Sequence, residues 1–311
     1  MNYLLFHHCS YSTMIPVKDF KFAVRPKVLV TNNDVPEVGL RILREKCDVT
    51  VCETGDRAEL LQKIKGVDGI FWATHSALNV EALEAAGPQL KSLTTMSVGL
   101  DYVDIEELKR RKIPLGYTPS VLSDAVADLA VGLAIAAGRN FHVGRQKIES
   151  NQWENRPQWL GGYELRDSTV GIVGFGGIGS TIAKRLSGFD VKEFLYCGHS
   201  QKPAADKIGA KFVPFKELAA KSDFIFIICP LTPETKHMFN AEIFDMMKPS
   251  SVLVNIARGG VVDQEAMYDA LKNGKIFAAG LDVMTPEPLP ADHPLLKLPN
   301  CGTYAMIVCH G

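Results

Sequence analysis

The chain has 311 residues, which is longer than one typical domain and predicts two domains, each large enough to bury its own core. Hydrophobic residues make up 46% of it and charged residues 22%, as in an ordinary globular protein. The formal net charge of −1 gives no basic surface for nucleic acid, and the apolar runs are far shorter than the roughly 20 residues of a membrane span.

Regular patterns begin at Pro26, and residues 1–25 are expected to form a disordered N-terminal extension. No acid precedes Asp19, so a mitochondrial presequence is an alternative, but the segment lacks the Arg-rich amphipathic character of one. The seven cysteines are odd in number and follow no metal-ligand spacing. We therefore expect reduced thiols, no metal site and a cytoplasmic location.

From Pro26, strand-like and helix-like runs alternate as far as residue 121. The strand-like KVLVTN comes first and is followed by EVGLRILREK, which has apolar residues at helical spacing. Because strands that alternate with helices form parallel sheets, residues 26–121 are predicted to form a small α/β domain. A helix-compatible stretch then runs from Ser123 to Trp153, and its apolar first half indicates burial in an interface between domains or subunits.

The segment RDSTVGIVGFGGIGSTIAKRL holds the most specific local pattern of the chain. A β-branched run over Thr169–Val173 is followed by Gly174, Gly176 and Gly179 at G-x-G-x-x-G spacing, and then by helical residues. The three glycines allow a tight turn, close approach of a pyrophosphate to the backbone, and close packing of helix on strand. A strand, turn and helix in this order predict dinucleotide binding at the helix N-terminus.

An NAD-binding fold usually carries an acid at the end of its second strand, for the ribose 2′-hydroxyl. Here the second strand ends at Tyr196 and is followed by Cys197, Gly198, His199 and Ser200, with no acid, and Lys202 lies close by. Such donors suit a 2′-phosphate, so the sequence predicts NADPH, with NADH as the weaker alternative. The competing interpretation is that His199 and Lys202 are ordinary solvated loop residues.

Further apolar strand runs, among them FIFIICPL and SVLVNIARG, alternate with helical segments up to residue 300. Strands this apolar belong in a sheet that is covered on both faces. Residues 122–300 are therefore predicted to form a doubly wound domain.

Ligands bind at the carboxyl ends of strands in open parallel sheets, and four such ends carry candidate residues. Arg258 follows an apolar strand, where its planar guanidinium can hold a carboxylate or ketone oxygen. Glu287 stands between two prolines, where a rigidly held carboxylate could orient a catalytic histidine. Val98 and Gly99 could offer backbone N–H groups to a carboxylate, and the loop Cys229–Thr235 would lie near a nicotinamide. The competing interpretation of Arg258 is a surface arginine at the end of a strand, and that of Glu287 is a solvated acid in a turn.

Together these motifs resemble the D-isomer-specific 2-hydroxyacid dehydrogenases, most closely their glyoxylate reductase/hydroxypyruvate reductase branch. The resemblance extends from about Lys27 to Cys301 and rests on TMSVGLDYVD, GYTPSVLSD, VGIVGFGGIG, FLYCG, SDFIFIICPLTPET, NIARGGVVD, AAGLDVMTPEPLP and HPLL. It implies two Rossmann-like α/β domains. These are a flavodoxin-like substrate-binding domain over residues 26–121 and a doubly wound NAD(P)-binding domain over residues 122–300.

The family reduces 2-keto acids to D-2-hydroxy acids with hydride from NAD(P)H. The resemblance implies that Arg258 holds the substrate and that the backbone of Val98 and Gly99 binds its carboxylate. It implies that Glu287 supports a catalytic histidine, and that Trp159 is lent to the substrate site by the partner in a homodimer. The cofactor-binding residues that it implies lie at strand ends and are Gly174, Gly176, Gly177, Ile178, Gly179, His199, Ser200, Cys229, Pro230, Ile256, Arg258 and Asp282.

One departure from the family bears on catalysis. After its Asn-Cys the family continues with a strand, a Pro-His pair and a helix, whereas this chain reads NCGTYAMIVCHG, an atypical tail over residues 301–311 without that helix. The position expected for the catalytic histidine is Met306, because His310 comes too late and His293 lies in another loop. A positioned general acid contributes about 10²- to 10⁴-fold, so we expect binding to be kept and most turnover to be lost.

The leading hypothesis is therefore a cytoplasmic, NADPH-dependent reductase of glyoxylate and hydroxypyruvate to glycolate and D-glycerate, acting between its two domains. A second hypothesis is a catalytically impaired isoform that binds NADPH. A third is an enzyme like 3-phosphoglycerate dehydrogenase, which would favour NAD and need extra cations near Ser97. Fold alone does not separate these.

Overall fold

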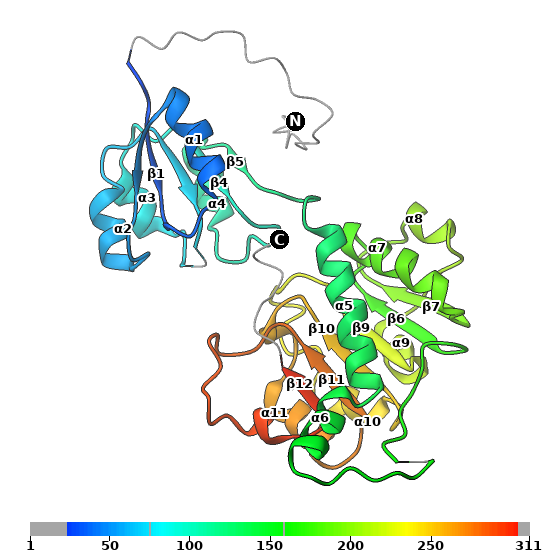
Figure 1. The fold of residues 1–311 in the computed structure, drawn as a ribbon. Helices are drawn as coiled ribbons and strands as arrows, with labels where there is room; N and C mark the ends of the chain where they lie inside the picture. The colour runs from blue at the N-terminus through cyan, green and yellow to red at the C-terminus, as the bar shows by residue number, and fades with distance from the viewer. Residues whose placement is uncertain (1–23, 75, 158, 304–311) are drawn as a thin grey trace. The chain divides into compact units, whose positions relative to one another are not determined.

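The computed structural model describes residues 24–74, 76–157 and 159–303 of the chain. The chain divides between Val121 and Leu122 into two compact units (Figure 1). Most of the expected N-terminal extension, and the positions Met306 and His310, lie outside the described residues. Among the described residues, no helix combines the length and the apolar character that crossing a membrane requires.

The first unit is built on a five-stranded parallel sheet with the strand order β2-β1-β3-β4-β5. Its strands are β1 (Lys27–Val30), β2 (Asp48–Val51), β3 (Gly69–Trp72), β4 (Ser92–Thr95) and β5 (Leu115–Gly116). This order is the flavodoxin-like one, which confirms the fold expected for this part of the chain.

Four helices connect these strands, and two of them begin at side-chain caps. Asn79 and Asp104 accept hydrogen bonds from the backbone N–H groups three residues ahead, at 3.2 and 3.0 Å. Such caps satisfy donors that the start of a helix leaves unpaired. The core of the unit includes Leu29, Trp72 and Leu83. The helices are α1 (Glu37–Lys46), α2 (Arg57–Lys63), α3 (Val80–Ala86) and α4 (Ile105–Arg111).

Helix α4 carries a carboxylate that is buried among arginines. Glu107 is 9% exposed and accepts hydrogen bonds from Nε and Nη2 of Arg110, at 2.7 and 2.6 Å, and from Nε of Arg111 at 2.6 Å. These donors, Arg110 first, lower the pKa of Glu107 from 4.5 to about 2. Arg111 also donates to the carbonyl oxygen of Leu83 at 3.0 Å, so the cluster ties α4 to α3.

Arg25 makes defined contacts with β2 and the end of α1. Arg25, which the sequence analysis placed in the extension, donates to Asp48 Oδ1 at 3.1 Å and to the carbonyl oxygen of Cys47 at 2.8 Å. Its guanidinium thus holds the start of β1 against the start of β2. The acceptors lie more than 20 residues away, so no local pattern marks this contact.

The second unit contains a seven-stranded parallel sheet in the order β12-β11-β10-β9-β6-β7-β8. Counted from β6, this is the 3-2-1-4-5-6 order of dinucleotide-binding sheets with one strand added, which confirms the doubly wound fold. Every residue of β6, β9, β10 and β11 is buried. The strands are β6 (Thr169–Val173), β7 (Glu193–Cys197), β8 (Lys211–Phe212), β9 (Phe224–Ile227), β10 (Val252–Asn255), β11 (Ala278–Leu281) and β12 (Cys301–Thr303).

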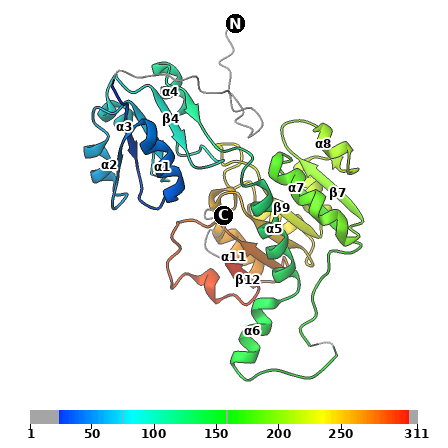
Figure 2. The same ribbon diagram turned by 45° about the horizontal axis from the view of Figure 1, so that its top comes forward.

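Helices cover both faces of this sheet. Val126 of α5 and Ile182 of α7 pack in one apolar cluster, and Figures 1 and 2 both show these two helices side by side. Leu218 of α9, Phe244 of α10 and Met267 of α11 pack in the other cluster. The helices are α5 (Ser123–Gly138), α7 (Gly177–Leu186), α8 (Pro203–Asp206), α9 (Phe215–Lys221), α10 (Ala241–Met246) and α11 (Gln264–Lys272), with 3₁₀ turns η1 (Ser187–Phe189), η2 (Gly259–Val261) and η3 (Pro294–Lys297).

The helical stretch expected from Ser123 to Trp153 is broken. Asn140 adopts a φ of 56°, so α5 ends at Gly138 and a second helix, α6 (Phe141–Glu149), follows. The chain turns where Gly162 crosses Gly138, so closely that a Cβ at 162 would lie 2.3 Å from the Gly138 carbonyl oxygen. Since this contact joins residues 24 positions apart, helical periodicity cannot reveal it.

The sheet also extends beyond residue 300, at which we expected the second domain to end. Cys301–Thr303 pair with β11 as strand β12. Strands β8 and β12 are only two and three residues long, which is too short for a hydrophobic pattern to predict them.

Candidate active site

The carboxyl ends of the strands of the second unit meet along one edge, because every strand pair runs parallel. Backbone hydrogen bonds link the residues just beyond them. The N–H of Gly174 donates to Cys197 O at 3.0 Å, and the N–H of Asp282 donates to Asn255 O at 3.0 Å. Neighbouring links run from Ile228 N to Val173 O at 2.8 Å and from Ile256 N to Ile227 O at 3.4 Å. The cofactor-binding residues expected from the sequence are thus gathered on this edge.

The glycine turn has the shape that a dinucleotide diphosphate requires. Gly174 has a φ of 98°, and a Cβ there would lie 2.9 Å from the backbone nitrogen of Cys229. A Cβ at Gly179 would lie 2.4 Å from the carbonyl oxygen of Gly174. A Cβ at Gly176 would meet no described atom within 4 Å. Gly174 and Gly179 are therefore required by the fold, whereas the space beside Gly176 is open to a ligand.

Helix α7 begins at this turn. Gly176 is its N-cap, no described side chain caps it, and Ser180 is the first residue whose N–H bonds back along the helix, to Gly176 O at 3.0 Å. The N–H groups of Gly177, Ile178 and Gly179 consequently have no partner within the helix. These donors and the positive end of the helix dipole fit the two phosphates of a nicotinamide dinucleotide.

The loop after β7 is where the ribose of the adenosine half would lie in such a fold. His199 and Ser200 are exposed, the Lys202 ammonium donates to Ser200 Oγ at 3.2 Å, and the Lys202 N–H donates to the Tyr196 hydroxyl at 3.0 Å. Tyr196 is buried, so its hydroxyl fixes the path of the loop. The sequence did not reveal Glu234, whose pKa is lowered chiefly by a hydrogen bond from Thr232 and slightly by the charge of His199. An acid therefore lies within electrostatic range of His199.

The loop after β9 is closed by its own hydroxyl groups. Thr235 Oγ1 donates to the Pro230 carbonyl oxygen at 2.6 Å and accepts from the Thr232 N–H at 2.8 Å. Leu231 packs on the next loop, since a Cβ at Gly260 would lie 3.2 Å from its Cδ2. Cys229 is buried here, and burial raises the pKa of its thiol to about 11, so it stays protonated at neutral pH.

Arg258 lies just beyond β10 and is half-buried. Its carbonyl oxygen accepts from Nδ2 of Asn255 at 3.0 Å, and Asn255 Oδ1 accepts from the Ala257 N–H at 3.1 Å. Nη1 of Arg258 donates to the Ala257 carbonyl oxygen at 2.7 Å. Asn255 is 1% exposed and shapes the loop, a role that its place at the end of an apolar strand did not reveal.

Glu287 lies in a turn that is pressed against the Arg258 loop. Glu287 Oε1 accepts from the Met284 N–H at 2.8 Å and the side chain is exposed. A Cβ at Gly259 would lie 2.0 Å from the carbonyl oxygen of Met284. The structure therefore packs the turn that carries Glu287 directly on the residue after Arg258. Asp282, at the end of β11, is buried beneath this turn's start.

In the first unit, Val98 and Gly99 lie in the loop that follows β4. Ser97 Oγ donates to the Gly99 carbonyl oxygen at 2.8 Å and lies 2.6 Å from the Tyr102 hydroxyl oxygen. Among the described residues, neither the Val98 N–H nor the Gly99 N–H has an acceptor. These two N–H groups are therefore open to an acceptor, and a carboxylate is the one expected from the sequence.

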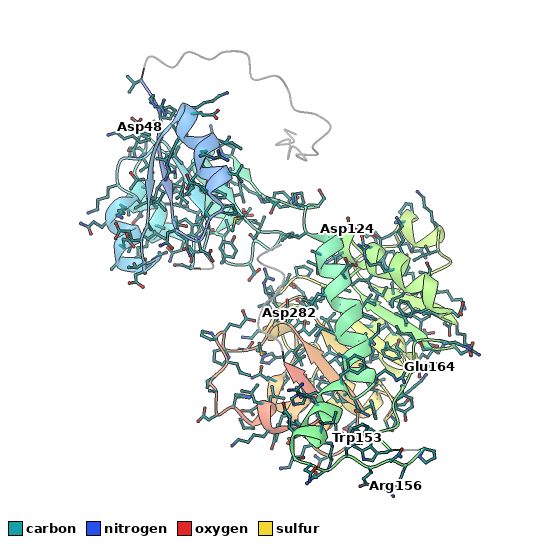
Figure 3. The ribbon with its side chains drawn as sticks, viewed as in Figure 1. Asp48, Asp124, Trp153, Arg156, Glu164 and Asp282 are labelled. Carbon is teal, nitrogen blue, oxygen red and sulfur yellow. The ribbon has the colours of Figure 1, made fainter. Side chains whose placement is uncertain are left out.

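Trp159 is not brought to the glycine turn of its own chain. The start of α5 lies beside that turn, because a Cβ at Gly177 would be 3.4 Å from Ser123 Oγ, whereas Gly162 packs on the far end of α5. A helix of 16 residues separates the two ends by about 24 Å. Figure 3 shows Trp153 and Arg156, from the segment that contains Trp159, beyond this far end.

Met306 and His310 lie outside the described residues, so the position expected for a catalytic histidine is not placed. His293 is described, and its Nδ1 accepts from the Leu295 N–H at 3.2 Å, which caps η3. Among residues 24–303 that the structure describes, no three His, Cys, Asp or Glu side chains gather as a metal site.

Comparison with known proteins agrees with this geometry. A family model described as "D-isomer specific 2-hydroxyacid dehydrogenase, NAD binding domain" matches residues 131–306. The chain is 43% identical over 282 residues to the glyoxylate reductase/hydroxypyruvate reductase of Mus musculus, covering 88% of this chain and 86% of that protein. It is 43% identical over 281 residues to the protein of the same name from Homo sapiens, with coverage of 88% and 86%.

A similar solved structure is the NADPH-dependent glyoxylate/hydroxypyruvate reductase from Sinorhizobium meliloti in complex with NADP and malonate. It superposes with a TM-score of 0.81 at 31% sequence identity, covering 93% of this chain and 88% of that one.

Proposed function

The chain belongs to the D-isomer specific 2-hydroxyacid dehydrogenase family, and from that premise we propose that it reduces glyoxylate and hydroxypyruvate, to glycolate and D-glycerate, with NADPH. Family membership confirms the resemblance found in the sequence and makes the chain an oxidoreductase that uses a nicotinamide dinucleotide and acts on small 2-hydroxy or 2-keto acids. The observation that carries the proposal lies in the second unit. A turn that fits a diphosphate and the loop that bears Arg258 stand on one edge of one sheet.

Each group of the chain has a distinct part in this proposal. The N–H groups at the start of α7 hold the diphosphate, and the open space beside Gly176 admits it. The bound nicotinamide supplies the hydride. Arg258 binds the keto oxygen and polarises the carbonyl, while the N–H groups of Val98 and Gly99 bind the substrate carboxylate.

We propose NADPH as the preferred cofactor because residues 197–202 contain no acid and offer donors at His199, Ser200 and Lys202. The naming of the S. meliloti relative as NADPH-dependent supports this choice. Glu234 acts in the opposite direction, since its carboxylate would repel a 2′-phosphate at close range. The three donors lie on the loop where the phosphate would bind, so we expect them to dominate.

Turnover also needs a group that delivers a proton to the keto oxygen. Glu287 keeps one carboxylate oxygen on the Met284 N–H and has the other with which to orient such a group. A histidine would stand at position 306 by resemblance, and the sequence has Met306 there. We propose that this residue slows turnover, and that Ala305→Pro with Met306→His raises it by about 10²-fold or more.

We further propose that the chain works as a homodimer in the cytoplasm. Helix α6, whose residues are all described, has none buried, and Phe141, Ile148 and Trp153 in and after it are 59%, 55% and 71% exposed. Exposed apolar side chains grouped in one segment favour contact with a second copy, which would also explain a Trp159 that serves the partner. The five described cysteines are unpaired, which favours a reducing compartment.

The test is the oxidation of NADPH, and separately of NADH, with hydroxypyruvate, glyoxylate and 3-phosphohydroxypyruvate. It compares the unsubstituted chain with the variant that carries Ala305→Pro and Met306→His. We expect NADPH to bind to both, and the variant to be much faster with the first two substrates. A preference for the phosphorylated substrate with NADH would favour an enzyme like 3-phosphoglycerate dehydrogenase instead. Binding of NADPH without turnover in either protein would favour the non-catalytic isoform.

A further inference from the structure

Gln264 occupies the first position of α11 and joins that helix to the turn that carries Glu287. The preceding residue, Asp263, caps the helix by accepting from the Ala266 N–H at 3.1 Å. The backbone at Gln264 is therefore fixed by the cap, and its half-buried side chain is directed to the segment after β11. Gln264 is not among the residues proposed above to bind the cofactor or the substrate.

The side-chain amide of Gln264 forms two hydrogen bonds with the backbone of one residue of that segment, Thr285. Its Nε2 donates to the Thr285 carbonyl oxygen at 2.6 Å, and its Oε1 accepts from the Thr285 N–H at 3.0 Å. Reversing the amide would place donor against donor and acceptor against acceptor, so only one orientation satisfies both bonds. Nε2 also lies 3.3 Å from His293 Nε2, but His293 Nδ1 already accepts from Leu295. A ring whose Nδ1 accepts carries its hydrogen on Nε2, so both Nε2 atoms are donors and this approach is not a third hydrogen bond.

Thr285 follows a residue that contacts both the Arg258 loop and Glu287. The residue before it, Met284, presses its carbonyl oxygen on Gly259, next to Arg258, and gives its N–H to Glu287 Oε1 at 2.8 Å. The Met284 carbonyl and the Thr285 N–H belong to one peptide group, so a movement of that peptide would shift the support of the Arg258 loop and the Glu287 carboxylate together. The two hydrogen bonds between Gln264 and Thr285 hold this segment of backbone to α11.

We propose that Gln264 is a positioning residue for the oxo-acid site, and this inference rests on the proposed function. By fixing the backbone on both sides of Thr285 it sets the Met284–Glu287 turn against Gly259, and thereby the placement of Arg258. Gln264 touches neither the glycine turn nor α7 in these contacts, so it acts on the substrate side alone.

Three variants separate this role from a general effect on folding. Gln264→Ala removes the amide, Gln264→Met keeps the side-chain length without the hydrogen bonds, and Glu265→Ala changes the exposed neighbour on the same helix turn. Three measurements are made on each full-length chain. They are hydrogen exchange at the Thr285 amide, the affinity for NADPH, and the affinity for malonate with NADPH bound, both affinities by calorimetry.

We expect both Gln264 variants to exchange the Thr285 amide about tenfold faster or more and to bind malonate about tenfold more weakly. NADPH affinity should stay within about twofold, and Glu265→Ala should match the unsubstituted chain in every measurement. Malonate binding that is unchanged in both variants, or restored by Gln264→Met, would overturn the inference. A parallel loss of NADPH affinity would do the same, because it would indicate general damage.

Failure of the proposed function itself would look different. The unsubstituted chain would then bind NADPH but no malonate, and this would be evident before any variant was compared. If instead the unsubstituted chain binds malonate and only the variants fail to differ from it, the function stands and the role of Gln264 does not.

Discussion

Gly179 lies so close beneath Gly174 that a Cβ at 179 would stand 2.4 Å from the carbonyl oxygen of Gly174. The first turn of α7 is thereby packed on the loop that leaves β6, and the helix N-terminus points over the carboxyl edge of the sheet. In contrast, the space beside Gly176 is empty of described protein atoms. The same three-glycine pattern thus contains two glycines that the fold requires and a third, Gly176, beside which there is space for a ligand.

Gly179→Ala should destabilise the second unit and abolish tight NADPH binding. Alanine gains helix propensity, but its Cβ meets backbone that cannot yield easily, and overpacking of this kind costs about 1–3 kcal/mol. Denaturant unfolding and calorimetric titration measure the two effects. Gly132→Ala on α5 is the matched control, since its Cβ meets no described atom and helix propensity should stabilise it by up to about 1 kcal/mol. Equal stability of the two variants would contradict the packing argument.

Gly176→Ala should separate binding from folding. Gly176 has a φ of −93°, which alanine can adopt. The free energy of unfolding should therefore change by no more than about 1 kcal/mol, the difference between glycine and alanine as N-caps. The methyl group nevertheless occupies the space for the diphosphate, and NADPH affinity should fall by about tenfold or more. Gly188→Ala, which also meets no described atom, should leave the affinity unchanged. If Gly176→Ala bound NADPH as tightly as the original chain, the diphosphate would not bind at this turn.

His199→Asp should shift the chain from NADPH towards NADH. A carboxylate at the end of β7 can accept from the ribose 2′-hydroxyl and repels a 2′-phosphate. We expect the ratio of NADPH to NADH affinity to fall by about tenfold or more, equal to about 1.4 kcal/mol. His142→Asp on α6 controls for the loss of a histidine. A ratio that does not move in His199→Asp would place the ribose elsewhere.

Glu107→Gln should make the free energy of unfolding of the first unit depend less on pH between about 4.5 and about 2. The pKa of Glu107 is lowered from 4.5 to about 2 in the folded protein, so the unfolded chain takes up the proton first. The stabilisation from this carboxylate is present above pH 4.5 and is lost as the pH falls towards about 2. The difference in unfolding midpoint between the variant and the original chain should therefore be largest at neutral pH and should shrink towards zero as the pH falls to about 2.

The neighbour Glu106 provides the control for that measurement. It pairs with Lys109 but its side chain is 84% exposed, so Glu106→Gln should change the unfolding midpoint little at any pH. If Glu106→Gln and Glu107→Gln gave the same profile, the hydrogen bonds from Arg110 and Arg111 would not be the cause of the lowered pKa.

Much of the site was predictable because its signals are local. The β-branched run, the glycine spacing and the helix after it occupy one continuous segment, and each residue's conformational preference agrees with its place in the structure. Arg258 and Glu287 were found at strand ends for a similar reason, since an apolar run ends visibly in the sequence. Asn255 was overlooked because a single polar residue at the end of such a run has no distinguishing pattern.

By itself the sequence determined the class of fold, the dinucleotide turn and the family, since hydrophobic periodicity, glycine geometry and a fixed order of motifs are all written along the chain. Only the tertiary structure decided where α5 breaks, which loops support Arg258, and what Gln264 holds. The reason is physical. Those features depend on single contacts between residues far apart in the chain, such as Gly138 with Gly162 and Gln264 with Thr285, 21 positions away, and their energies leave no periodic trace in the sequence.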